Sequence, residues 1–120
     1  ASTQDRTTAD KIEECFIKAG LAPPSMEEIS AKFGASTRTV IPLLVGQKRL
    51  VEIEKGLYFP VMTLNKLQEV IREQIKKNGP MSVAQFRDLT KTTRKFAVPL
   101  LEYFDAVHFT RRTGDVRILL

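Results

Sequence analysis

The chain has 120 residues, of which 42% are hydrophobic, and this is enough to form packed cores and excludes wholesale disorder. Its length suits one ordinary domain or two very small ones. No apolar run approaches the length of a membrane span and no signal-peptide pattern opens the chain, so we expect a cytoplasmic protein without membrane contacts. The single cysteine, Cys15, cannot form an internal disulfide, which agrees with that setting.

The charge is distributed unevenly along the chain, whose formal net charge is +5. Residues 1–60 carry eight Lys or Arg and eight Asp or Glu, whereas residues 61–120 carry eleven and six. The positive excess therefore lies in the second half, where it favours a polyanionic partner. Residues 1–8 are small and polar and lack an initiator Met, which suggests a fragment of a longer protein.

The first half predicts three helices followed by a β-hairpin. A helix over 9–19 ends before Gly20 and two prolines. A short helix over 26–33 follows, with Ser25 and Glu28 in the pattern of a capping box. A third helix starts near Ser36, and strands over 50–54 and 57–59 flank a turn at Gly56.

The second half repeats this plan. Residues 36–44 align with 93–101 at a shift of 57, which also aligns Leu50 with Val107 and Val51 with His108. The helices are expected over 64–77, over 83–89 and from near Thr93, and the strands over 107–111 and 116–119 around Gly114. Pro42 and Pro99 fall at the same place in the two third helices. Three helices and a closing hairpin are the winged-helix plan, so we predict a mainly helical α+β chain of two tandem winged-helix domains, 1–62 and 63–120.

In this plan the start of the third helix and the hairpin, or wing, converge on one surface. At the helix start the second half places Lys91, Thr92, Thr93, Arg94 and Lys95. Cations, hydroxyls and free helix-terminal amides there suit phosphate. The wing adds Arg111, Arg112 and Arg117. Alternation predicts that Phe109, Val116 and Ile118 point inward, that Arg112 and Arg117 point outward, and that Arg111 lies near the tip.

The first half serves as an internal comparison. Its matching helix start reads Ala35, Ser36, Thr37 and Arg38, with one charge instead of three, and its wing carries Glu52 and Glu54. Two carboxylates repel phosphate. We therefore predict that the second domain binds the polyanion and that the first is a spacer or docking unit.

The sequence offers no catalytic constellation. The only histidine, His108, is expected to open a wing strand without a partner for metal binding. Cys15 lies beside Phe16, where a buried thiol acts as a small hydrophobe. Neither zinc-ligand spacing nor a phosphate-binding loop occurs. Adjacent acidic pairs such as Glu13 and Glu14 are expected to be solvated. We predict a protein that is not an enzyme and that holds no metal or cofactor.

Three runs in the second half are distinctive. They are Phe-Arg-Asp-Leu at 86–89, Thr-Arg-Lys-Phe-Ala-Val-Pro-Leu-Leu-Glu-Tyr-Phe-Asp at 93–105, and Thr-Arg-Arg-Thr-Gly-Asp-Val-Arg at 110–117. This part of the chain resembles the C-terminal end of SelB, the family of bacterial selenocysteine-specific elongation factors. The resemblance implies a winged helix that recognises the selenocysteine insertion element, a hairpin in mRNA. Ribosome, GTP and selenocysteinyl-tRNA would then be partners of the parent protein only, through a GTPase part that this chain lacks.

Two other functions compete with binding of an RNA hairpin. A tandem winged-helix DNA-binding regulator would place the third helix in a major groove. Phe96, Ala97 and Pro99 read base edges poorly, which disfavours this alternative. A protein-interaction scaffold would use the neutral first domain.

Overall fold

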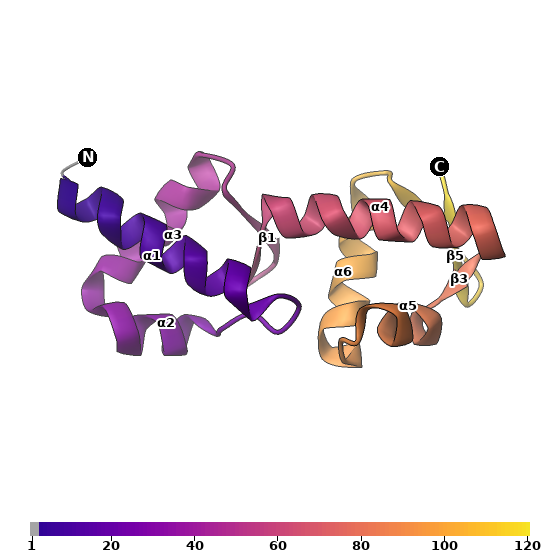
Figure 1. The fold of residues 1–120 in the computed structure, drawn as a ribbon, viewed down its shortest axis with the longest axis horizontal. Helices are drawn as coiled ribbons and strands as arrows, with labels where there is room; N and C mark the ends of the chain where they lie inside the picture. Colours follow the sequence, from indigo (N-terminus) through magenta and orange to yellow (C-terminus); the bar gives the residue numbers. More distant parts are fainter. Residues whose placement is uncertain (1–2) are drawn as a thin grey trace. The chain divides into compact units, whose positions relative to one another are not determined.

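The computed structural model describes residues 3–120, with side chains from Thr8 onward, and the chain forms two compact units (Figure 1). The first unit ends at Leu64 and the second spans Asn65–Leu120, so the division falls within a helix. The architecture is α+β and mainly helical, as predicted. Within the described residues, no helix is both long and apolar enough to cross a membrane.

The first unit packs three helices against a two-stranded hairpin. Its elements are α1 (Thr3–Ala19), α2 (Met26–Phe33), the 3-10 turn η1 (Gly34–Ser36), α3 (Thr37–Gly46), β1 (Leu50–Glu54) and β2 (Leu57–Pro60). The strands are antiparallel, and Gly56 in their turn has φ 79°, the positive value predicted for it. One apolar cluster joins the helices to β1, and it contains Ala9, Ile12, Phe16, Ile29, Val40, Ile41, Leu44 and Leu50.

The second unit has the same order of helices and one additional strand. Its elements are α4 (Val61–Asn78), β3 (Met81–Ser82), α5 (Val83–Thr90), α6 (Arg94–Ala106), β4 (Thr110–Thr113) and β5 (Val116–Leu119). The short strand β3 was not predicted from the sequence; it pairs with β5 and makes β5 the central strand of a β3-β5-β4 sheet. The fully or nearly fully buried apolar side chains are Leu67, Ile71, Met81, Phe86, Ala97, Leu100, Leu101 and Phe104.

Matching local signals set the short second helix of each unit. Ser25 caps α2 and Ser82 caps α5, in both cases through a hydrogen bond from the backbone N–H three residues later. Glu28 and Gln85 reciprocate by accepting from the backbone N–H of the capping serine. The first capping box was predicted, and the second has Gln where the first has Glu. Both boxes satisfy amides that a helix start leaves without partners.

The last strand pair begins later than the sequence predicted. The strand β4 starts at Thr110 instead of residue 107, because α6 continues to Ala106. Val107 caps that helix and is 46% exposed, so it is neither a strand residue nor part of the core. His108 lies in a turn with φ 62°, as Lys48 does with φ 60°. His108 and Lys48 are therefore structural equivalents. The residue numbers of equivalent positions in the two units differ by 60 at the wings and by 57 at α2 and α5.

A contact between the first helix and the wing base recurs with different chemistry. In the first unit Arg49, just before β1, donates to Glu13 of α1 at 2.9 Å and to Asp10 at 2.7 Å. Glu13 is therefore paired and not simply solvated, and the two carboxylates, Glu13 first, raise the pKa of Arg49. In the second unit the equivalent residue is Phe109, and the guanidinium of Arg72 on α4 lies 5.3 Å from the centre of its ring.

Candidate nucleic-acid interface

The cations predicted at the start of the third helix lie on the surface. Thr93 is the N-terminal cap of α6 but makes no capping hydrogen bond with its side chain, unlike Ser82 on α5. Arg94 and Lys95 form the first turn of α6 and are exposed, and Thr92 is half-buried. First-turn amides of a helix carry a partial positive charge, so this end of α6 combines two side-chain cations with the helix dipole.

Lys91 joins α5 to α6 in an unusual backbone conformation. Its φ of 59° and ψ of 28° are left-handed, and its side chain is exposed. Gly34 ends the second helix of the first unit and also has a positive φ, 70°, but its ψ of −149° places it in a different region. A lysine in the left-handed region carries strain that glycine avoids. The second unit thus places a cation where the fold alone would favour glycine.

The two adjacent wing arginines point to opposite faces of the sheet. In the register of the hairpin, Arg112 is opposite Arg117 and Arg111 is opposite Ile118. Residues directly opposite share a face, and successive residues in a strand alternate. Arg112 lies on the face directed at α6, where its Nε donates to the carbonyl of Gly114 at 2.9 Å. Arg111 lies on the other face.

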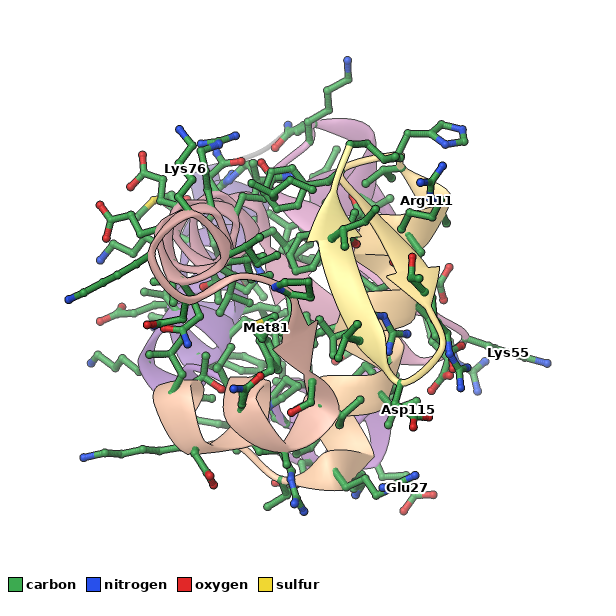
Figure 2. All side chains as sticks on the ribbon, turned by 90° about the vertical axis from the view of Figure 1, so that its right-hand side faces the viewer. Glu27, Lys55, Lys76, Met81, Arg111 and Asp115 are labelled. Atoms are coloured by element: carbon green, nitrogen blue, oxygen red, sulfur yellow. The ribbon has the colours of Figure 1, made fainter. Side chains whose placement is uncertain are left out.

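The position of Arg111 also corrects a prediction. Figure 2 shows Arg111 at the end of the hairpin away from Asp115, whereas Asp115 marks the tip. Arg112 is therefore the wing arginine closer to the tip. In Figure 1 α6 begins at the lower left of the second unit, and the hairpin strand β5 lies at its right, beside β3.

The predicted outward orientation of Arg117 is wrong. Arg117 is only 4% exposed, and its Nη2 and Nε lie 3.2 and 3.3 Å from Oδ2 of Asp105 on α6. Met81, which pairs with Arg117 across β3 and β5, is completely buried. Val116 and Ile118 consequently lie half-buried on the opposite face, against the prediction. If the predicted alternation of a strand is shifted by one residue, the inward and outward side chains are exchanged. The prediction was shifted here because the buried residue is an arginine that is paired with a carboxylate.

Sequence reasoning missed Asp105, the partner of this arginine, and Thr110, which donates to the same carboxylate. Thr110 is 1% exposed and donates its hydroxyl hydrogen to Oδ1 of Asp105 at 2.7 Å. One carboxylate therefore binds β4 through Thr110 and β5 through Arg117. The available signal was a single arginine between Val116 and Ile118, a pattern that calls for an acidic partner when the strand is central.

The first unit lacks this basic surface. Its third helix begins with Thr37, which is completely buried like Ala97 of α6 and donates to the carbonyl of Ile29 at 3.4 Å. Arg38, the second residue of α3, is exposed. Glu52 and Glu54 are exposed on its wing. Its helix start thus supplies one exposed cation where the second unit supplies two, and its wing adds negative charge.

The remaining candidate groups do not join the interface. His108 is exposed in the turn before the wing. Cys15 is half-buried on α1, where Lys32 Nζ lies 3.8 Å from its sulfur. Tyr103 packs its ring edge-on against Phe104 at a centroid distance of 5.6 Å. Within the described residues, no three or more His, Cys, Asp or Glu side chains are grouped to hold a metal ion.

The order of elements in the second unit defines its class. A helix, a short strand, two helices and a hairpin that pairs with the short strand form a winged helix. The sequence profile of the family described as "Elongation factor SelB, winged helix" matches residues 73–119 of this unit.

Two selenocysteine-specific elongation factors are similar to large parts of the chain. The selenocysteine-specific elongation factor of Desulfomicrobium baculatum is 32% identical over 109 residues, covering 88% of this chain and 17% of that protein. The corresponding factor of Escherichia coli K12 is 34% identical over 70 residues, covering 58% of this chain and 11% of that protein. The chain therefore spans less than a fifth of the length of either relative.

A solved structure matches almost end to end. It is the mRNA-binding domain of elongation factor SelB from E. coli in complex with SECIS RNA, with a TM-score of 0.83, 27% identity, and coverage of 99% of this chain and 98% of that one. The chain belongs to the winged-helix region of the SelB family.

Proposed function

We propose that this chain is a tandem pair of winged helices that binds a selenocysteine insertion element, a hairpin in mRNA, through its second unit. The observation that carries the proposal is that exposed cations lie at the start of α6 and on the wing of the second unit, whereas the wing of the first unit carries two exposed carboxylates. The similarity to an mRNA-binding domain solved with SECIS RNA supports the nature of the ligand.

The proposed contact residues are a revision of the predicted set. Lys91, Thr92, Thr93, Arg94 and Lys95 meet phosphates at the start of α6, and Arg112 meets the backbone from the wing tip. Arg111 lies on the other face of the sheet and contributes less. Arg117 is withdrawn from the contact set, because Asp105 neutralises it inside the fold.

A hairpin in RNA suits this surface better than duplex DNA. The major groove of an A-form stem is too narrow for a helix to enter, so a small protein contacts the backbone and the loop bases. Phe96, which follows the two cations, is half-buried and lies under the ammonium of Lys95, so it does not extend into a groove to read base edges. The first unit acts as a spacer or docking unit and not as a second RNA-binding surface.

The role in the cell follows from the family. In the proposed parent protein, a GTPase part delivers selenocysteinyl-tRNA to the ribosome while this chain holds the mRNA hairpin downstream of a UGA codon. The fragment itself catalyses no reaction and acts in the cytoplasm.

Titration of the chain against three nucleic acids tests the proposal. The ligands are a SECIS-type RNA hairpin, the DNA hairpin of matching sequence, and duplex DNA, measured by gel shift at low salt. We expect the RNA hairpin to bind most tightly. Equal or tighter binding of duplex DNA would favour a DNA-binding regulator, and no binding to any of the three would favour a protein-interaction scaffold.

A further inference from the structure

One carboxylate of α6 binds both strands of the wing of the second unit. Asp105 accepts a hydrogen bond from Thr110 on β4 at 2.7 Å and two from Arg117 on β5 at 3.2 and 3.3 Å. Both donors are almost completely buried, whereas the side chain of Asp105 is 24% exposed. Asp105 lies eleven residues after Arg94, which is about 16 Å along the helix axis. It is therefore too far from the start of α6 to touch a phosphate bound there.

The carboxylate also controls which charges the wing presents. Arg112 and Arg117 are directly opposite on neighbouring strands and share a face. Two like charges in such a pair repel each other and destabilise the pairing. Asp105 neutralises Arg117, and Arg112 is then free to fold back onto the carbonyl of Gly114 at the tip. We therefore expect the orientation of Arg112 to depend on a carboxylate that does not touch it.

The first unit shows that a wing does not require this attachment. The position equivalent to Asp105 is Val45, and Leu50 stands in place of Thr110. There the wing base is bound to α1 through Arg49 and Glu13 instead. Coupling of the wing to the third helix by an ion pair is therefore specific to the unit whose third helix begins with exposed cations.

We propose that Asp105 is a positioning residue for RNA binding, which holds the wing against α6 and keeps Arg112 directed at the polyanion. This inference rests on the proposed function. It predicts that a loss of negative charge at Asp105 weakens the binding of a polyanion, although simple electrostatics predicts the opposite.

Two variants of equal net charge distinguish weaker binding from tighter binding as the effect of removing a negative charge. Asp105→Asn and Asp115→Asn both remove one negative charge, but Asp115 is exposed at the hairpin tip and forms no ion pair with any residue that the structure describes. We expect Asp115→Asn to bind the RNA hairpin about twofold to threefold more tightly because it removes repulsion. We expect Asp105→Asn to bind about tenfold more weakly. The dependence of its log K on log salt should also become shallower by about one unit, because one cation no longer contacts the RNA.

The salt dependence separates positioning from a loss of stability. A variant that is only less stable, measured well below its melting temperature, keeps the slope of the wild type. Should Asp105→Asn fail to fold, Asp105→Glu keeps every charge and moves the carboxylate by one methylene group, and we expect the same shallower slope. Wild-type affinity and slope in a folded Asp105 variant would overturn the inference. If the wild-type chain itself binds no RNA hairpin, the proposed function is overturned together with this inference.

Discussion

Lys91 and Gly34 end the second helix of the two units with positive φ, 59° and 70°, but only Lys91, with ψ 28°, is left-handed, since Gly34 has ψ −149°. A left-handed backbone costs a residue with a side chain roughly 1–2 kcal/mol, and glycine avoids that cost but loses more entropy on folding. The second unit therefore accepts strain at the point where its chain turns from α5 into the start of α6. Strained backbone is often retained where a side chain is needed for function.

Replacing Lys91 by Gly should separate stability from binding. We expect the free energy of unfolding to stay the same or to rise by up to about 1 kcal/mol, because the left-handed strain is relieved. We expect RNA affinity to fall by about 1 kcal/mol, because one phosphate contact is lost. Denaturant unfolding and hairpin titration measure the two effects. A Lys91→Gly chain with unchanged affinity would remove Lys91 from the interface.

The cations at the start of α6 should dominate the interface. The double variant Arg94→Ala with Lys95→Ala is expected to weaken hairpin binding by about 2–3 kcal/mol with little change in melting temperature, since both side chains are exposed. The matched control is Arg38→Ala in the first unit, which should leave affinity unchanged. Thr37 is not a suitable control, because it is buried and hydrogen-bonded. A comparable loss in both units would contradict an interface confined to the second.

The wing arginines should differ in importance. Arg112→Ala is expected to weaken hairpin binding more than Arg111→Ala, because only Arg112 lies near the tip on the face directed at α6. Neither change should alter stability by more than about 0.5 kcal/mol, as both side chains are exposed. Gel shifts of the two single variants at one salt concentration make the comparison. A larger loss for Arg111 would place the RNA on the outer face of the sheet.

The salt dependence of hairpin binding should show how many phosphates the chain contacts. Four exposed cations, Lys91, Arg94, Lys95 and Arg112, predict a slope of log K against log salt of about −3. A slope well beyond −4 would require further cations, including Arg111 or residues outside the second unit. A slope near zero would mean that phosphate contacts do not drive binding.

The ion pair of the first unit should affect stability and not binding. Arg49→Ala removes a partly buried arginine bonded to Glu13 and Asp10, and we expect the free energy of unfolding to fall by about 1–2 kcal/mol. Hairpin affinity, measured well below the melting temperature, should match the wild type. A large loss of affinity in the folded variant would show that the first unit contributes to RNA binding.

Much of the fold follows from local signals. Ser25 with Glu28 marked the start of α2, and Gly56 and Gly114 marked the hairpin turns, because each signal acts over a few residues. The repeat at a shift of 57 located α5 and the start of α6 for the same reason. The positions of Lys91, Thr92, Thr93, Arg94 and Lys95 next to a helix start could thus be predicted from the sequence alone.

The phase of the wing could not be predicted in this way. The alternation of residues in β5 alone favours two apolar side chains pointing inward and Arg117 pointing outward. The contacts that reverse this orientation exist only in the tertiary structure. Met81 comes from a strand about 35 residues away in sequence and makes β5 central, and Asp105 comes from the end of α6. The sequence by itself determined the helices, the turns and which half is basic, since those depend on neighbours along the chain. The tertiary structure decided which arginine is buried and which is presented, because the free energy of a charge depends on the partners that folding brings to it.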